Sequence, residues 1–201
     1  SILIPTYNYK VEALVNELHA QATDCQIDFE IIIGDDFSNQ TIYNNTDLSK
    51  TGQIKLHRSD SSIGRTEMRK LLCKKAKYNW MLFIDSDMLP TEKEYIGKYI
   101  NALEKNPEIK LLGTWARVLD SQGKHLYDLK HPIDYKTIKQ KMYFNSMFLN
   151  PSVMFYSHIL NEVGGYPYKY RRAAQDYAFF FKIIKRYKAE NYPEILLDYV
   201  T

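Results

Sequence analysis

Three runs of consecutive apolar residues in the first half of the chain constrain its fold most strongly. They read "SILIP" (1–5), "FEIII" (29–33) and "WMLFI" (80–84), and they are rich in β-branched and aromatic side chains. Such runs are typical of strands that are buried on both faces, as in a parallel sheet covered by helices. A weaker run, "IKLHR" (54–58), predicts a further strand between the second and the last of them.

Helical patterns separate these strands. Residues 11–22 carry apolar side chains three or four positions apart, and residues 68–76 repeat the pattern. After "WMLFI", the sequence "TEKE" (91–94) predicts a capping box, with Thr91 as the cap and Glu94 bonding back to it, at the start of a helix that ends near Pro107. Strand–helix alternation over residues 1–105 therefore predicts a Rossmann-like α/β half.

The second half, residues 106–201, has a different pattern. Residues 109–129 predict two strands joined by a turn at 120–123, and "SVMFYS" (152–157) and "EILLDYV" (194–200) predict two more, with a helix over 173–188 between them. The Lys-rich segment 124–144 shows little periodicity after His131 and predicts either an irregular loop that borders a ligand or a solvated surface segment. Because no Pro-, Gly- or Ser-rich linker separates the halves, we expect one domain, residues 1–201, built on one sheet.

Composition excludes some classes of function. A net charge of +3 over 201 residues is too small to favour nucleic acid as a partner, although residues 121–201 hold 12 Lys and Arg against 7 Asp and Glu. That excess fits either an acidic or phosphate-bearing ligand or an ordinary solvated surface. No apolar run approaches the length of a membrane span. Cys25 and Cys73 lack the spacing of metal ligands, so we expect free thiols in a reducing, cytoplasmic compartment.

Polar clusters follow three of the predicted strands, namely "PTYN", "GDDFSN" and "DSDM". Each one alone fits a turn, but the carboxyl ends of parallel strands share one edge, and carboxylates that lie close together need a cation or hydrogen-bond donors. Asp85 and Asp87 are two residues apart and point to the same side of an extended segment. Oxygen ligands without His or Cys select Mg²⁺ or Mn²⁺, so the pair predicts a metal–diphosphate site.

Several motifs, taken in order along the chain, resemble those of glycosyltransferase family 2, the inverting enzymes of the GT-A fold. They are "ILIPTYN", "EIIIGDDFSN", "DSD", "VGGYP" and "QDYAFFFK", and they extend over nearly the whole chain. The resemblance implies that the nucleotide base, usually uracil, is bound by Pro5, Thr6, Tyr7 and Asp36. A carboxylate can accept the imide N–H of uracil, and a Tyr ring offers a face for stacking. Asp35 is then a turn or helix-capping residue.

The resemblance also implies roles for charged residues near the diphosphate. Arg65 and Arg69, on the helix before the "DSD" strand, are equal candidates for nucleotide contact, and a surface salt bridge is the alternative for either. Asp87 would bind the metal directly. Asp85 would bind the ribose or share the metal through a water molecule.

The catalytic base implied by the resemblance is Asp176. The family has an acidic pair here, whereas this chain has Gln175 before Asp176, which puts acceptor recognition and the tuning of the base in doubt. The alternative for Asp176 is an acid that favours a helix N-terminus. The acceptor side would include Gly165, Tyr166, Gln175 and Trp115, although the Gly pair 164–165 also fits a helix end and Trp115 also fits the core.

The resulting hypothesis is a metal-dependent inverting glycosyltransferase that moves a sugar from a nucleotide-diphospho-sugar, most simply a UDP-sugar, to a hydroxyl group. The acceptor would be a saccharide or a lipid-linked saccharide in polysaccharide or glycoconjugate synthesis, which leaves open a peripheral contact with the cytoplasmic face of the membrane. One alternative is a nucleotidyltransferase, although "PTYNYK" is not a Gly-rich phosphate loop. The other is an inactive sugar-nucleotide-binding domain. The chain begins without Met, so we expect a catalytic core cut from a longer protein.

Overall fold

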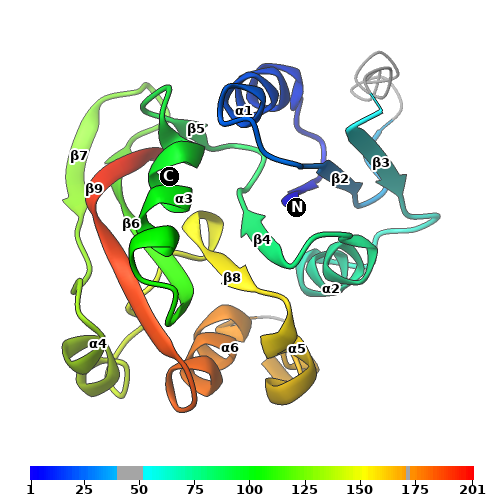
Figure 1. Ribbon diagram of the computed structural model, residues 1–201. Coiled ribbons are helices and arrows are strands. Elements are labelled where there is room, and N and C mark those ends of the chain that lie inside the picture. The colour runs from blue at the N-terminus through cyan, green and yellow to red at the C-terminus, as the bar shows by residue number, and fades with distance from the viewer. Residues whose placement is uncertain (40–51, 171–172) are drawn as a thin grey trace.

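The protein has an α/β fold built on one nine-stranded sheet with helices on both faces (Figure 1). The computed structural model describes residues 1–39, 52–170 and 173–201. The strand order is β3-β2-β1-β4-β8-β6-β9-β5, and β7 pairs with β6. The strands are β1 (Ile2–Thr6), β2 (Ile31–Asp35), β3 (Ile54–Arg58), β4 (Trp80–Phe83), β5 (Leu89–Pro90), β6 (Ile109–Leu119), β7 (His125–Leu129), β8 (Met154–Tyr156) and β9 (Lys188–Val200).

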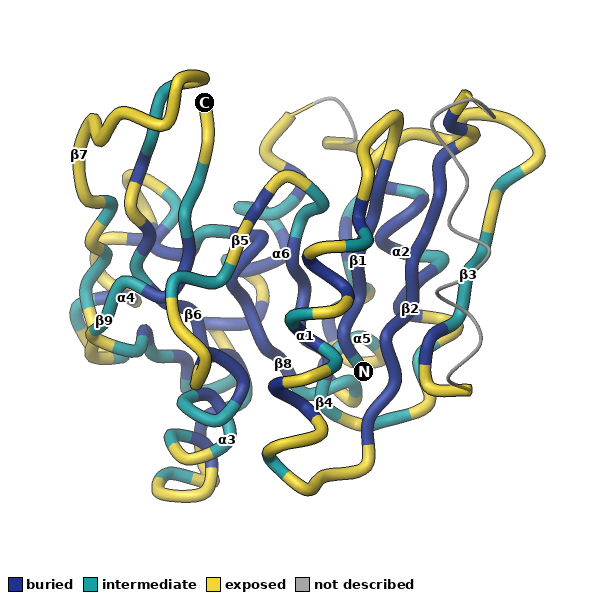
Figure 2. The backbone as a smooth tube through the Cα atoms, turned by 90° about the horizontal axis from the view of Figure 1, so that it is seen from above, coloured by how far each residue is buried: buried dark blue, intermediate teal, exposed yellow. Residues whose placement is uncertain are grey.

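The first four strands form the expected parallel half of the sheet. β1 lies between β2 and β4, and β2 also pairs with β3, all in parallel register. Alternate side chains enter two separate cores: Leu3 and Ile32 pack on one face, whereas Ile4 and Ile33 pack on the other. Both faces of β1, β2 and β4 are covered, which explains the unbroken apolar runs at 2–5, 31–33 and 81–83, whereas the edge strand β3 has polar residues that are partly exposed. β1 and β2 form a dark central part of Figure 2.

The helices divide between the two faces. α1 and α3 supply apolar side chains to one core, and α2, α4, α5 and α6 supply them to the other (Figure 1). The helices are α1 (Glu12–Asp24), α2 (Arg65–Lys75), α3 (Tyr95–Lys105), α4 (Tyr135–Lys141), α5 (His158–Val163) and α6 (Gln175–Ile184). Two 3₁₀ turns, Asn150–Ser152 and Tyr168–Tyr170, precede β8 and α6.

The second half of the chain continues the same sheet, as expected. β8 joins the halves because it pairs antiparallel with β4 on one side and with β6 on the other. β6 also pairs in parallel with β9 and antiparallel with β7, and Gly123 N donates to Asp120 O in the turn between β6 and β7. The predicted hairpin and the shared sheet are thus confirmed.

Three local predictions were wrong. Thr91 does not cap α3: its hydroxyl donates to Ile195 O at 3.0 Å, because the pairing of β5 with β9 brings Thr91 to that strand. The segment after His131, which was expected to be irregular, instead contains α4, and the Asp134 carboxylate caps this helix by accepting Thr137 N at 2.9 Å. The helix expected over 173–188 ends at Ile184, because the last strand is longer than predicted and begins at Lys188.

Cys25 and Cys73 are free cysteines, in agreement with the prediction. Within residues 1–39, 52–170 and 173–201, no helix is both long and apolar enough to cross a membrane.

Gly113 of β6 provides a test of packing between the sheet and the loops that cover it. A Cβ atom at this position would lie 2.3 Å from Asn191 Oδ1. Asn191 cannot move away easily, since its Nδ2 donates to Pro132 O and to Met147 O. We expect Gly113→Ala to lower the free energy of unfolding by about 1–3 kcal/mol in urea titrations.

The matched control is Gly97→Ala in α3, where an added Cβ would meet Cys25 Sγ at an ordinary 3.6 Å. Ala has a higher helix propensity than Gly, so this variant should be unchanged or up to about 1 kcal/mol more stable. Equal stability of the Gly113→Ala variant and the parent protein would show that the loops at 132 and 147 are held loosely.

Candidate active site

A cavity of about 430 Å³ opens at the carboxyl edge of the parallel strands. This is the edge at which α/β sheets bind ligands. Seven of the residues that the sequence placed on the donor side line it: Pro5, Thr6, Tyr7, Asp36, Arg65, Asp85 and Asp87. They come from the ends of β1 and β2, from the first residue of α2 and from the turn after β4. The topology therefore brings the three polar clusters of the sequence to one site.

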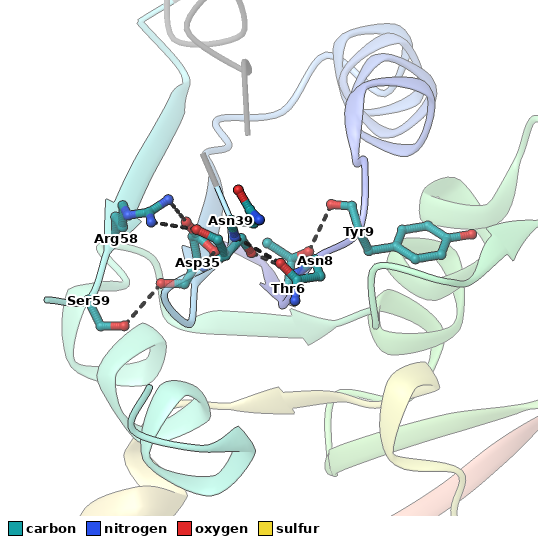
Figure 3. A network of polar contacts seen from close by, with 8 residues as sticks. Thr6, Asn8, Tyr9, Asp35, Asn39, Arg58 and Ser59 are labelled. Atoms are coloured by element: carbon teal, nitrogen blue, oxygen red, sulfur yellow. Dashed lines mark hydrogen bonds and ion pairs between the residues drawn. The ribbon is translucent and has the colours of Figure 1, made fainter. Parts of the chain in front are cut away.

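The loops after β1 and β2 are joined by hydrogen bonds that shape one wall of the cavity (Figure 3). Asn8 N donates to Ser38 Oγ at 2.7 Å, and Asn39 N donates to Asn8 Oδ1 at 2.8 Å. Thr6 Oγ1 donates to Tyr9 O at 3.1 Å within the first loop. These bonds hold the loop that carries Tyr7, whose side chain is 59% exposed and offers a free aromatic face.

The neighbouring acids Asp35 and Asp36 have different surroundings. The Asp35 carboxylate is fully buried, accepts Ser38 N at 2.9 Å and forms an ion pair with Arg58 at 2.8 Å (Figure 3). It is a turn residue, as predicted, and its partners are structural. Asp36 instead lies at the wall of the cavity.

The Asp36 carboxylate is held by the loop that leads into α2. It accepts Ile63 N at 2.6 Å, Gly64 N at 3.0 Å and Ser62 Oγ at 3.1 Å. A carboxylate has about four lone-pair sites, so three donors leave room for one more. The side chain is thus fixed in place and can still accept one N–H from a ligand in the cavity.

Asp85 and Asp87 both line the cavity, with Arg65 on the same wall. Partial loss of hydration and the neighbouring Asp85 charge raise the pKa of Asp87, whereas the charge of Arg65 offsets part of this effect. A cation at this position would relieve the repulsion between the two carboxylates. Within the part of the chain that the structure describes, no group of three or more His, Cys, Asp or Glu could enclose a metal ion. The donor set fits a hard divalent cation that completes its coordination with ligand oxygens.

Arg69 does not line the cavity, contrary to the expectation that it contacts the nucleotide. Its side chain is 2% exposed, and its Nη2 donates to both oxygens of Asp85, at 2.8 and 3.1 Å. Burial alone would lower the pKa of the guanidinium, but the charges around it, Asp85 foremost and Asp176 among them, hold it above its ordinary value. Arg69 therefore fixes the orientation of the Asp85 carboxylate from outside the cavity.

The opposite side of Arg69 contacts the second half of the chain. With the Asn150 amide oriented so that both of its ends are satisfied, its oxygen accepts Arg69 Nη2 at 2.9 Å and Nε at 3.1 Å. Its nitrogen then donates to Tyr166 Oη at 3.1 Å. Tyr166 is 1% exposed and packs against Phe83 and Phe179, so the expectation that it contacts the acceptor was wrong. It completes a buried network that begins at Asp85.

Asp176 lies in the first turn of α6, and its carboxylate accepts Tyr177 N at 2.8 Å. The negative charge of Asp176 interacts with the buried network, because it contributes to the raised pKa of both Arg69 and Tyr166. The Gln175 side chain before it is buried. Asp176 does not line the cavity.

The remaining predicted acceptor residues lie farther from the cavity wall. Gly164 and Gly165 both have positive φ, at the C-terminal end of α5, which fits the helix-end alternative. Trp115 lies in β6, where its Nε1 donates to His131 O at 2.8 Å and Lys130 stands over its ring. Neither Gly165 nor Trp115 lines the cavity.

The cavity also contains residues that sequence reasoning missed: Tyr9, Met68, Ser86 and Tyr199. Tyr9 stands in the quoted "PTYNYK", and its closeness to Tyr7 was a usable signal. Tyr199 lies near the C-terminus of the chain. It comes to the cavity because Asp198 before it pairs with Leu89 of β5, which follows the turn that carries Asp85 and Asp87. No local pattern indicates that pairing. Asn150 was missed for the same reason.

Comparison with solved structures places this architecture among the GT-A glycosyltransferases. The crystal structure of S. aureus TarS 1–349 in complex with UDP-GlcNAc superposes with a TM-score of 0.73 at 17% identity, over 100% of this chain and 58% of that one. At that identity the similarity shows the fold. The chain itself belongs to glycosyl transferase family 2, whose family model matches residues 1–164.

Two curated relatives have similar sequences. An uncharacterised glycosyltransferase of Haemophilus influenzae is 26% identical over 191 residues, which cover 92% of this chain and 62% of the relative. An uncharacterised glycosyltransferase of Methanocaldococcus jannaschii is 28% identical over 207 residues, which cover 99% of this chain and 69% of the relative. The chain thus spans somewhat under two thirds of the first relative and slightly more of the second.

Arg65 and Arg69 stand one helical turn apart on α2 and should behave differently when they are replaced. Arg69→Met leaves Asp85 without its partner, so we expect a loss of stability near the lower end of about 3–5 kcal/mol, since Asp85 keeps partial hydration. Arg65→Met at an exposed position should change stability by less than about 0.5 kcal/mol. Urea unfolding of both variants measures the difference.

The same pair distinguishes orientation from ligand contact. Arg65→Met should weaken Mn²⁺-dependent UDP binding roughly tenfold, as expected for the loss of one charge-assisted contact. If Arg69→Met were as stable as the parent protein, the buried network would not be the element that holds Asp85.

Proposed function

We propose that this chain is the catalytic part of an inverting glycosyltransferase that transfers a sugar from a nucleotide-diphospho-sugar, most simply a UDP-sugar, to a hydroxyl acceptor. The observation that carries the proposal is the cavity in which the ends of β1, β2 and β4 bring a base-binding wall and two carboxylates together. The family and the fold support it, as does the presence of UDP-GlcNAc in the solved TarS neighbour.

The base-binding wall accounts for recognition of a pyrimidine nucleotide. Asp36 has one free acceptor position for an imide N–H, and Tyr7 presents an exposed ring for stacking. Arg65 lines the same cavity as Asp85 and Asp87, and a cationic side chain there favours a diphosphate. The donor would extend from the loop after β1 toward Asp87.

Asp87 is the direct ligand for Mn²⁺ or Mg²⁺ in this proposal. The pairing of Asp85 with Arg69 lowers its capacity as a second direct ligand and suits it to the ribose or to a metal-bound water. When bound, the cation acts as a Lewis acid on the leaving diphosphate. Asp85, Asp87 and Arg65 would together fix the donor so that its anomeric carbon faces the acceptor side.

Asp176 acts as the general base. Its carboxylate takes the proton from the acceptor hydroxyl as the oxygen attacks the anomeric carbon on the face opposite the nucleotide, so the configuration inverts. Placement of both substrates across one cavity supplies much of the remaining rate. The acceptor would be a saccharide or a lipid-linked saccharide used in polysaccharide or glycoconjugate synthesis, with contact at the membrane periphery.

The decisive experiment is a panel of nucleotide sugars with Mn²⁺, read first by thermal shift and then by release of the nucleoside diphosphate. A donor that stabilises the protein and is slowly hydrolysed or transferred supports the proposal. Release of pyrophosphate from a nucleoside triphosphate and a sugar phosphate would identify a nucleotidyltransferase. Stabilisation by a donor that is neither hydrolysed nor transferred to any saccharide tested would identify a binding domain.

Asp87→Asn should separate metal binding from folding. Loss of one of two neighbouring carboxylates removes repulsion, so the metal-free variant should be at least as stable as the parent protein. Its stabilisation by UDP with Mn²⁺ should disappear, because the diphosphate loses the cation that offsets its charge. Thermal shift with Mn²⁺ or with chelator measures both effects, and equal stabilisation by UDP in chelator would contradict the metal site.

Asp176→Asn should affect chemistry and leave donor binding nearly unchanged. General-base catalysis contributes about 10²–10⁴-fold, so kcat should fall by that factor in a transfer assay. Asp128→Asn, an exposed substitution on β7, is the matched control and should keep the parent rate. A near-normal rate for Asp176→Asn would move the base to another residue.

A further inference from the structure

An exposed aromatic turn follows α4 on the face of the molecule that carries α6. Phe144 is 90% exposed, the highest value among the large apolar side chains described, and Tyr143 beside it is 63% exposed. The turn is ordered by hydrogen bonds, because Phe144 N and Asn145 N both donate to Lys141 O. An ordered backbone therefore holds two neighbouring aromatic rings in solvent.

Exposed lysines surround these rings. Lys136, Lys139 and Lys141 lie on α4 and Lys185 follows α6, and within the described residues none of them has a carboxylate partner. The acid at the start of α4, Asp134, accepts Thr137 N as the helix cap. We name the six side chains the docking surface: Lys136, Lys139, Lys141, Tyr143, Phe144 and Lys185.

The docking surface is fixed to α6, the helix that carries Asp176 in its first turn. The Tyr143 ring packs edge to face against the Phe181 ring of α6, with centroids 5.1 Å apart. Lys185 Nζ lies 4.4 Å from the centroid of the Phe181 ring. Tyr135 Oη donates to Ile184 O at 2.7 Å, and Tyr177 Oη donates to Met142 O at 2.6 Å. Figure 1 shows α4 and α6 at the same end of the molecule, with the start of β9 between them.

We propose that the docking surface binds an anionic phospholipid bilayer. The Phe144 and Tyr143 rings enter the interfacial region, and the lysines contact lipid phosphates around them. Aromatic side chains and lysines are the residues that bind membrane interfaces, and each basic residue adds to the attraction of an anionic leaflet. The binding does not depend on the transfer reaction, so its test can fail separately from the proposed function.

The combination of charge and exposed aromatic side chains favours a bilayer over other polyanions. Lysines alone would suffice for a soluble anionic polymer, which gains little from an apolar ring at the tip of the turn. A protein partner needs an apolar interface core much larger than two rings. A bilayer matches both features, because its surface is anionic and apolar groups lie directly beneath its headgroups.

Vesicle cosedimentation tests the proposal with the chain as it stands. Vesicles of phosphatidylcholine and phosphatidylglycerol in about equal parts should bind the protein, and vesicles of phosphatidylcholine alone should bind it much less. Replacement of Lys136, Lys139 and Lys141 together by Ser should weaken binding about 100-fold. Phe144→Ser should weaken it about tenfold with no change in charge.

The matched control replaces Lys93, Lys105 and Lys124 by Ser, which removes the same charge from exposed positions outside the docking surface. This variant should bind nearly as the parent protein does. All variants change exposed side chains, and unchanged thermal unfolding shows that they are folded. Equal loss of binding in both triple variants would overturn the proposal in favour of general charge attraction. Full binding by Phe144→Ser, with complete competition by dextran sulfate, would overturn it in favour of a soluble polyanion.

Discussion

The ion pair between Arg69 and Asp85 is the interaction on which the candidate site depends. A guanidinium that is 2% exposed has lost nearly all its hydration, and it is stable there only because Asp85 and the Asn150 amide replace that water. The three groups come from α2, from the turn after β4 and from the 3₁₀ turn before β8. Through Asn150, this network joins α2 and the turn after β4 to the second half of the chain.

The same pair makes two neighbouring carboxylates chemically different. Asp85 is oriented and partly neutralised by Arg69, whereas Asp87 lines the cavity with a raised pKa that the charge of Arg65 offsets only in part. A similar division separates Asp35, which is buried with Arg58, from Asp36, which keeps one acceptor position open. Among the described residues, one acid of each pair is held by an Arg and the other is not.

Helix α6 relates the proposed chemistry to the proposed membrane contact. It begins beside the buried network with Asp176 and ends against the docking surface with Phe181 and Lys185. Because α4 is pinned to it by two Tyr hydroxyls, a bilayer bound at Phe144 would lie at a fixed orientation to the base. That geometry suits an acceptor whose sugar is attached to a lipid in the same membrane.

The sequence by itself determined the parallel half of the fold and most of the polar residues that line the cavity. Continuous apolar runs require strands buried on both faces, and polar residues that follow such strands meet at one edge because parallel strands end together. The sequence could not determine that Arg69 is buried while Arg65 lines the cavity. Both residues lie on one amphipathic helix, and their burial depends on which other segments of the chain pack against that helix. Asn150 and Tyr199 were beyond prediction for a related reason. Asn150 contacts Arg69 and Tyr199 pairs with Val118, and each partner lies 81 residues earlier in the chain, so only the tertiary pairing of β8 with β4 and of β9 with β6 and β5 decided their positions.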